Sequence, residues 1–396
     1  MHDRYAKDTD LLTFINGAKE RHHWEFIYQF RKRDQCQRMA QAFTTMSLKP
    51  TALDYIYRPL GMLIMEAMID QDKTGQYLSP WAFNCTLLEE LLVEDRFESY
   101  LEYLHSFDAF CLRKIQERVV VHLSVSEGFG KWREELLGEV IEKMAAAVGQ
   151  TAQGISGVLS NTKLLLEKLC LTLELDGDVE VPRDTLDSPL FSITTEWDRF
   201  VSCLLETLAE LRLTLAKEFS QNIEVTKLLR VLPLKPQDCL FHKVRGCEKR
   251  CPFCKAPCAV QDTEHKEHRA RLHRPKGLLS YTCDNSCSLS HMSCPADIAQ
   301  DNLFANKDTE SKPLAYRDYR TIFPDWSIPP EEPGNQTLCA YWRYVMVRFN
   351  ERFAEEYKQK PANLPEEWEK ITHEEALESL KELREKASDF MTLSSG

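Results

Sequence analysis

The stretch Leu204-Leu-Glu-Thr-Leu208-Ala-Glu-Leu211-Arg-Leu-Thr-Leu215-Ala-Lys-Glu-Phe219 decides the class of fold. Its large apolar residues recur in steps of 4, 3, 4 and 4, which places five of them on one face of an α-helix. Charged residues occupy the opposite face. The pattern therefore predicts an amphipathic helix whose apolar face packs against a partner helix.

Similar signals on both sides of this stretch predict further helices. Ser79-Pro80 is typical of a helix N-terminus, and Thr372-His-Glu-Glu375 has the form of a capping box. Acidic residues, glycine and prolines between Leu173 and Ser192 indicate a loop. We therefore expect a mainly α protein: an extended helical bundle with a small zinc-stabilised module and a C-terminal helical pair. The expected divisions are helical regions at 1–172 and 193–235, a Cys/His-rich module at 236–335 and a C-terminal helical segment at 336–396.

Composition limits the class of partner and the compartment. The chain has 396 residues, 43% of them hydrophobic, a net charge of −12 and a pI near 5.5, which argues against a surface built to hold nucleic acid or an anionic membrane. The start of the chain has no apolar signal sequence, and the longest apolar run, Leu60 to Ile69, is about half of the roughly 20 residues that a membrane span needs. We expect a cytoplasmic or nuclear protein with reduced cysteines and no membrane span.

A cysteine-rich segment carries the clearest chemistry. Cys251-Pro-Phe-Cys254 offers two thiolates from one tight turn, and His268 and His273 follow at a spacing close to that of Cys₂His₂ zinc sites. We predict that these four residues bind one structural Zn²⁺, with Cys247, Cys258 and His265 as alternates. Acidification should release the metal and open the segment from about 240 to 280, because its residues offer little apolar packing.

A second group fits no zinc-finger spacing that we can justify. It consists of Cys283, Cys287, His291 and Cys294, and for these we favour ordinary structural roles over a second zinc site. The scattered Cys36, Cys85, Cys111, Cys170 and Cys203 are expected to be small buried apolar residues.

The sequence offers no catalytic or nucleotide-binding motif. His265-Lys-Glu-His268 lacks the spacing of a hydrolytic zinc site, so a closed structural site is favoured. Gly128-Phe-Gly130-Lys131-Trp132 resembles a phosphate-binding loop only in part, because Trp132 stands where a Ser or Thr should be. Between Lys243 and Lys276 there are ten Lys and Arg against four acids, which would allow a phosphate contact. The segment nevertheless lacks the framework of a regular DNA-binding finger, so we expect nucleic acid to be an improbable partner.

The cysteine-rich segment resembles the C-terminal part of the very large interferon-inducible GTPases and their relative, the up-regulator of cell proliferation. The resemblance rests on Gly246-Cys247, Cys251-Pro-Phe-Cys254-Lys-Ala-Pro-Cys258, His265, His268, Leu272-His273-Arg274-Pro275, Tyr316-Arg-Asp-Tyr319, Phe323-Pro-Asp-Trp326-Ser-Ile328, Tyr341-Trp342, Phe349-Asn350 and Pro361-Ala362, and, upstream, on Phe30-Arg-Lys-Arg-Asp-Gln-Cys-Gln37. It implies a cytoplasmic or nuclear protein of interferon-linked innate defence, in which helical regions flank a dynamin-like GTPase domain. The GTP site cannot be carried over to any residue here.

These observations together predict a non-catalytic part of such a protein, serving interaction with protein partners or self-association. Two other functions stay open. The first is a zinc-dependent enzyme resembling a ubiquitin ligase, against which the prediction of a single zinc argues, because a cross-braced RING domain needs two. The second is a nucleic-acid sensor that uses the basic segment.

Overall fold

The computed structural model describes residues 34–125, 128–153, 162–175, 181–192, 197–220, 225–260, 262, 264–283, 287–331 and 338–393. The chain divides into two compact units. Unit 1 contains Met1–Ile64 and Leu123–Lys235, and unit 2 contains Met65–His122 and Pro236–Gly396. The division falls within one long helix, α2 (Lys49–Asp70), and near the end of another, α5 (Phe107–Val125).

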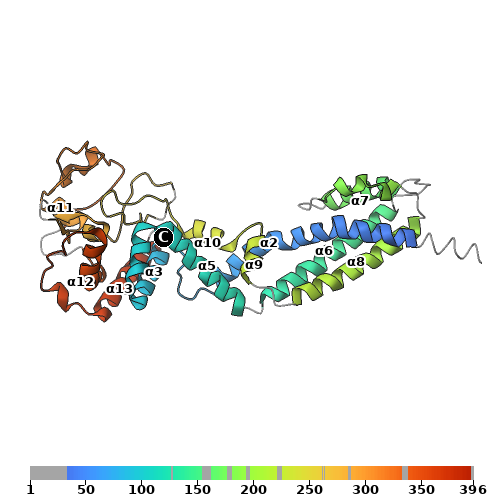
Figure 1. Cartoon of the computed structure of the whole chain (residues 1–396), viewed down its shortest axis with the longest axis horizontal. Helices are drawn as coiled ribbons and strands as arrows, with labels where there is room; N and C mark the ends of the chain where they lie inside the picture. The colour runs from blue at the N-terminus through green and yellow to red at the C-terminus, as the bar shows by residue number, and fades with distance from the viewer. Residues whose placement is uncertain are drawn as a thin grey trace, which may run out of the picture. The chain divides into compact units, whose positions relative to one another are not determined.

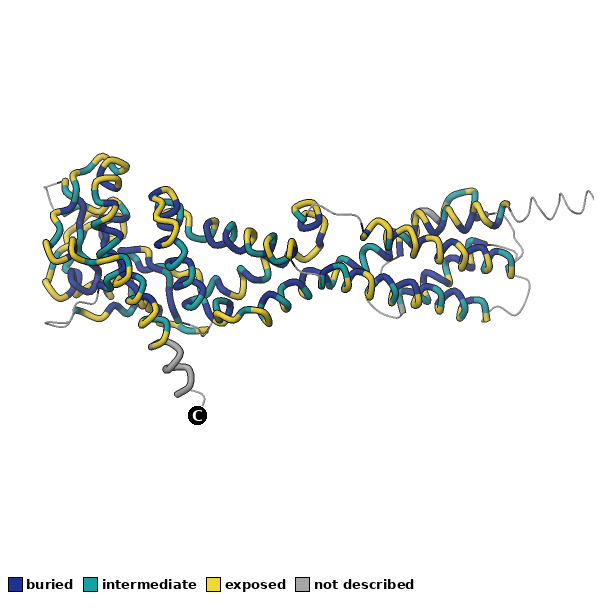
Figure 2. Tube along the Cα trace, turned by 90° about the horizontal axis from the view of Figure 1, so that it is seen from below, coloured by how far each residue is buried: buried dark blue, intermediate teal, exposed yellow. Residues whose placement is uncertain are grey.

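Unit 1 is a bundle of long helices. Residues 34–43 are α-helical and lead through a π-helical turn, η1 (Thr44–Leu48), into α2. The other long helices are α6 (Gly128–Gln153), α7 (Thr162–Leu175) and α8 (Trp197–Ser220), and a short one, α9 (Val225–Val231), follows. Helices α2, α6 and α8 lie side by side (Figure 1), and their buried faces are turned toward one another (Figure 2). The five apolar residues of the predicted stripe on α8 are all buried, which confirms the helix and its packing face.

A buried arginine, Arg133, lies beside the C-terminal end of α8 in this bundle. The guanidinium of Arg133 lies over the rings of Phe129 and Phe219, at 4.5 and 5.1 Å, and donates a hydrogen bond of 2.9 Å to the carbonyl oxygen of Phe219. Phe219 lies in the last turn of α8, where helix carbonyls lack partners within the helix. Arg133 therefore caps α8 from α6. The expected loop before α8 contains two short 3₁₀ turns, η2 (Asp184–Asp187) and η3 (Pro189–Ser192).

Unit 2 contains the C-terminal helical pair, α12 (Ala340–Tyr357) and α13 (His373–Leu393), together with α3 (Pro80–Glu94), α4 (Phe97–His105) and the greater part of α5. Helix α13 packs on both α12 and α3. The predicted N-cap is present, since Ser79 accepts a hydrogen bond from the backbone of Ala82. The predicted capping box is present too, with reciprocal bonds between Thr372 and Glu375.

The remainder of unit 2 has little regular structure. It contains α10 (Pro236–Val244), α11 (Cys294–Ala299), the 3₁₀ turns η4 (Lys276–Leu279), η6 (Tyr316–Thr321) and η7 (Trp368–Lys370), and two short antiparallel pairs, β1 (Thr282–Cys283) with β2 (Ser288–Leu289) and β3 (Leu303–Phe304) with β4 (Leu314–Ala315). Phe253 is its centre, with the rings of Phe304 and Tyr316 at 4.9 and 4.7 Å. The mainly α class is thus confirmed. None of the described helices combines the length and apolar character that crossing a bilayer demands.

Two glycines in helices of unit 1 give a test of its packing. A Cβ on Gly61 of α2 would lie 1.9 Å from the carbonyl oxygen of Leu234, whereas a Cβ on Gly138 of α6 would meet nothing within 4 Å. We expect Gly61→Ala to destabilise unit 1 by about 1–3 kcal/mol through overpacking, and Gly138→Ala to stabilise it by about 0.5–1 kcal/mol through reduced backbone entropy. Chemical unfolding followed by helical circular dichroism measures both. Equal shifts in the two variants would contradict the close approach at Gly61.

Candidate metal centre

A short hairpin sorts four cysteines into an inner and an outer pair. Arg250 and Pro257 form an antiparallel bridge, and the backbone N–H of Cys258 donates to the carbonyl of Lys249 at 2.9 Å. Inside this bridge, the backbone N–H of Cys251 donates to the carbonyl oxygen of Ala256, and the carbonyl oxygen of Cys251 accepts from the N–H of Lys255. Cys251 and Cys254 therefore lie inside the turn, while Cys247 and Cys258 lie at its open end.

The inner cysteines belong to the buried cluster, formed by Cys251, Cys254, His273 and Cys294. All four residues are buried, and their potential ligand atoms lie within 4.8 Å of one another. Sγ of Cys251 lies 3.8 Å from Sγ of Cys294, and Sγ of Cys254 lies 3.3 Å from Nδ1 of His273. Cys294 is brought to this place as the first residue of α11, whose N-cap is Ser293.

The outer cysteines belong to the outer cluster, formed by Cys247, Cys258, His265 and His268, whose potential ligand atoms also lie within 4.8 Å of one another. Sγ of Cys247 lies 3.6 Å from Nδ1 of His268, and Sγ of Cys258 lies 3.4 Å from Nε2 of His265. The two imidazole nitrogens are 2.9 Å apart. Cys247 and His265 are only half-buried, so this cluster is nearer to solvent than the buried cluster.

Both clusters have the dimensions of a tetrahedral zinc site. With Zn–S near 2.3 Å and Zn–N near 2.0–2.1 Å, tetrahedral ligand atoms are separated by about 3.8 Å for two sulfurs, about 3.6 Å for sulfur and nitrogen and about 3.3 Å for two nitrogens. The S···S distance of 3.8 Å and the S···N distance of 3.6 Å agree with these values. The other two S···N distances, 3.3 and 3.4 Å, and the N···N distance of 2.9 Å are shorter by a few tenths of an ångström. Each cluster supplies four protein ligands, so neither leaves the open position that a catalytic zinc requires.

Further contacts orient the histidines of the outer cluster. Nδ1 of His265 contacts the carbonyl oxygen of Asp262, and Nε2 of His268 lies 3.6 Å from a carboxylate oxygen of Asp325. The backbone of His268 also pairs with Asp325 and Ser327. An imidazole that donates one N–H to an oxygen presents its other nitrogen as a ligand, which is the usual arrangement around bound zinc. The outer histidines are thus held with a ligand nitrogen facing the cluster.

The pKa shifts of the buried cluster fit a group that binds a cation. Burial by itself raises the pKa of Cys254, but hydrogen bonds from Cys251 and Cys294 and the charge of His273 hold it well below its usual range. Burial by itself lowers the pKa of His273, but electrostatic interactions and hydrogen bonds with Cys254 and Cys251 raise it to about 10. Both shifts favour the charged forms of Cys254 and His273. A metal ion that binds through Nδ1 of His273 must displace any proton held there.

The structure divides the four predicted ligands between the two clusters. Cys251, Cys254 and His273 come together, but His268 lies with the three alternates, Cys247, Cys258 and His265. The sequence argument assumed that neighbouring Cys and His pairs close one local site, whereas the hairpin sends its inner and outer cysteines to different clusters. The other predicted group is also divided. Cys294 completes the buried cluster, while Cys283, Cys287 and His291 belong to neither cluster in the described part of the chain.

Cys294 was missed because it lies 43 residues after Cys251. One signal in the sequence could have singled it out: Ser293-Cys294-Pro295 has the form of a helix N-terminus, which fixes the position of its first residues and buries Cys294.

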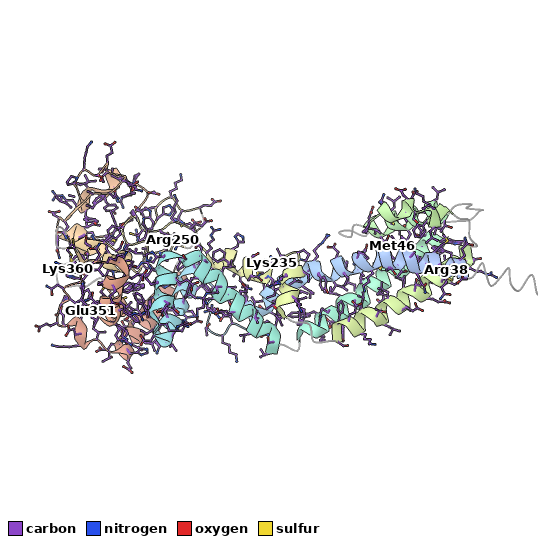
Figure 3. All side chains as sticks on the ribbon, viewed as in Figure 1. Arg38, Met46, Lys235, Arg250, Glu351 and Lys360 are labelled. Atoms are coloured by element: carbon purple, nitrogen blue, oxygen red, sulfur yellow. The ribbon has the colours of Figure 1, made fainter. Side chains whose placement is uncertain are left out.

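The basic segment from Lys243 to Lys276 is less exposed and less positive than its sequence indicates. Arg274 and Lys276 are buried inside unit 2. Arg250, labelled in Figure 3, pairs with Asp108 at 2.6 Å and lies over the ring of Phe107, and Arg245 pairs with Glu248 at 2.7 Å. Four of the ten basic residues counted in the sequence are thus buried, or half-buried in ion pairs, while six, including Lys266 and Arg271, are exposed.

Comparison with known proteins shows what the segment with both clusters is similar to. The sequence profile of the C-terminal domain of interferon-induced very large GTPase 1 matches residues 247–380, a range that begins at the first outer cysteine and includes both clusters. Residues 247–380 are thus similar to this C-terminal domain. The match ends within α13, so the domain comprises the clusters, the aromatic centre at Phe253 and the C-terminal helical pair.

The similarity to the very large GTPases extends upstream of this domain. The chain is 26% identical over 305 residues to human interferon-induced very large GTPase 1 and 23% identical over 302 residues to the mouse protein. Each alignment covers 74% of this chain but only 12% of the relative. The chain therefore corresponds to a small part of these proteins. No solved structure matches it.

Proposed function

We propose that this chain is a non-catalytic end region of a very large GTPase-like protein, and that two structural zinc ions hold its C-terminal domain together. The observation that carries the proposal is the pair of four-residue clusters with tetrahedral spacing. Structural zinc supplies folding free energy directly, which suits a segment with short strands and few helices. The clusters would hold the hairpin at 247–258, the loop at 259–273 and the start of α11 in one arrangement.

A role in interaction or self-assembly is consistent with the family and with the surface of unit 1. The sequence has no complete phosphate-binding loop, so this region contributes no GTP site of its own. Leu164 and Leu171 are exposed two turns apart on α7, and Leu213 is exposed on α8. Apolar side chains in such positions are suited to protein partners or a second copy of the chain. We propose a place in the cytoplasm or nucleus and a part in innate defence, as the relatives' interferon-induced name suggests.

The structure bears differently on the two alternative functions, a nucleic-acid sensor and an enzyme resembling a ubiquitin ligase. Burial or pairing of four of the ten basic residues weakens the case for a nucleic-acid sensor. The ubiquitin-ligase alternative is strengthened in one respect, because two interleaved clusters replace the single zinc that argued against it. A ubiquitin-transfer assay with the purified chain separates this alternative from a purely structural role for the metals.

Metal analysis tests the proposal. We expect two zinc ions per chain in the purified protein. Cys258→Ser in the outer cluster and Cys294→Ser in the buried cluster should each reduce the content by one, because serine is a poor zinc ligand. The matched control is Cys287→Ser, which changes an exposed cysteine outside both clusters and should retain both ions. One zinc or none in the unaltered protein, or an equal loss in the control, would show that the clusters are not two zinc sites.

A further inference from the structure

The buried cluster differs from the outer cluster in charge. Three thiolates and a neutral imidazole around Zn²⁺ carry a net charge of −1, whereas two thiolates and two imidazoles carry none. A net negative charge is costly inside a protein unless a positive group lies nearby, because burial removes the water that would solvate it. All four residues of the buried cluster are buried, so the structure should contain a cation for it.

Arg274, the residue after His273, is a buried cation fixed next to this cluster. Its side chain is among the largest that unit 2 buries completely, with an exposure of 1%. Nε donates to the carbonyl oxygen of Cys254 at 2.7 Å, and one terminal nitrogen, Nη2, donates to that of Lys255 at 2.8 Å. Both acceptors belong to the turn that carries the inner cysteines. The guanidinium is thus fixed directly against the loop that supplies two thiolates.

Among the described residues, no carboxylate accounts for this buried charge. Within the described part of the chain, Arg274 forms no ion pair, whereas the other buried cation of the segment, Lys276, pairs with Asp297. The remaining nitrogen, Nη1, has no hydrogen-bond partner among the described residues. Arg274, Trp81 and Trp342 line a cavity of about 10 Å³, enough for a single water molecule. The group nearest to Arg274 along its hydrogen bonds is thus the turn that carries Cys251 and Cys254 of the buried cluster.

The same side chain joins the cluster to the helices of unit 2. The guanidinium lies 5.7 Å from the ring of Tyr103 on α4 and 5.7 Å from that of Trp342 on α12. Arginine stacks on aromatic rings and tolerates burial better than lysine, because its charge is delocalised and more weakly hydrated. Any change in the charge of the cluster therefore acts on a cation held between two helices.

We infer that Arg274 is the counter-charge of a zinc ion in the buried cluster, and that it raises the affinity of this cluster for zinc while leaving the outer cluster unaffected. The inference rests on the two-zinc proposal. It also implies that zinc in this cluster favours the packing of the hairpin on α4 and α12.

Arg274→Lys and Arg274→Met give the decisive comparison, because both lose the forked hydrogen bonds and only the lysine keeps a charge. Zinc affinity is measured on the full chain by competition with a chromogenic chelator. Cobalt substitution identifies the cluster concerned, since a three-thiolate site absorbs differently from a two-thiolate site. We expect Arg274→Met to weaken the buried cluster by about 10- to 100-fold relative to Arg274→Lys, the range usual for groups next to metal ligands. The outer cluster should be unchanged in both.

The control is Arg271→Met, which removes an exposed cation three residues away and should leave both affinities unchanged. Equal zinc affinity of the buried cluster in Arg274→Lys and Arg274→Met would refute the charge role, and so would an equal loss at both clusters. If Arg274→Met does not fold, Arg274→Gln takes its place in the comparison with lysine. A protein that binds two zinc ions but shows no such difference refutes only the role of Arg274, whereas a protein without two zinc ions refutes the proposed function itself.

Discussion

Leu211→Asp should unfold unit 1 or destabilise it by about 4 kcal/mol, the scale of an unpaired charge placed in an apolar core. Leu211 is 6% exposed and lies at the centre of the apolar stripe of α8. This stripe faces α6, whose buried residues include Leu137, Val140, Ile141, Met144 and Val148. A carboxylate at this position has no described cation in the stripe to pair with. Thermal unfolding followed by circular dichroism should show a lower midpoint and a broader transition.

Leu213→Asp is the matched control, because Leu213 lies two residues further along the same helix and is 72% exposed. Its substitution should change the unfolding free energy by less than about 0.5 kcal/mol, as is usual at surface positions. If Leu213→Asp folds normally but loses self-association, the exposed face of α8 is part of an assembly surface. Identical melting of Leu211→Asp and the unaltered protein would mean that the stripe is not core.

The helices could be predicted from sequence because their signals are local. The stripe on α8 is periodic, the N-cap at Ser79 needs only the three following residues, and the capping box ends at Glu375. Each of these elements is present as predicted. The aromatic centre around Phe253 could not be predicted in this way. Its partners come from irregular segments with no apolar period, and only the fold brings Phe304 and Tyr316 onto its ring.

The candidate site was predicted by residue type but not by grouping. Local spacing identifies cysteines and histidines that can bind zinc, and seven of the eight residues in the two clusters were named as ligands or alternates. Which residues share a cluster depends on the hairpin, which separates the inner from the outer cysteines, and on Asp325, which lies 3.6 Å from the ring of His268. The role of Arg274 was also hidden, because its position in a basic segment suggested the surface, while Tyr103 and Trp342 bury it.

Removal of metal should open the outer part of the domain first. Zinc ligands must lose protons to bind the metal, so zinc should be released as the pH falls, and a chelator should have the same effect at neutral pH. Burial, together with the neighbouring His265, lowers the pKa of His268, so this imidazole stays neutral and able to bind metal to lower pH than usual. The outer cluster is nevertheless half-exposed at Cys247 and His265, so a chelator reaches it before it reaches the buried cluster.

The packing of residues 240–280 determines how much of this segment opens when the metal is removed. The sequence alone predicted that the whole segment from about 240 to 280 opens, but Cys251, Phe253 and Cys254 are part of an apolar cluster that gives the hairpin turn support besides metal. In the described part of the loop from 259 to 269, Val260 packs against this cluster, but the residues from 264 to 269 are not among its members. The main contacts of the loop are the backbone pairing of Ala259 with Arg269 and the bonds of His268 to Asp325 and Ser327. We therefore expect chelation to expose this loop well before the rest of the domain.

Limited trypsin digestion with mass spectrometry measures this opening at Lys266 and Arg269, both of which are exposed in the loop. Cleavage at these two sites should accelerate at least about tenfold on addition of a chelator, because each 1.4 kcal/mol of lost local stability raises the open population tenfold. Cleavage at Arg212, an exposed residue of α8 in unit 1, serves as the internal control and should not change. Addition of zinc should restore protection at Lys266. The same rate of cleavage at Lys266 with and without chelator would mean that metal does not hold the loop, and the outer cluster would then have no structural zinc to lose.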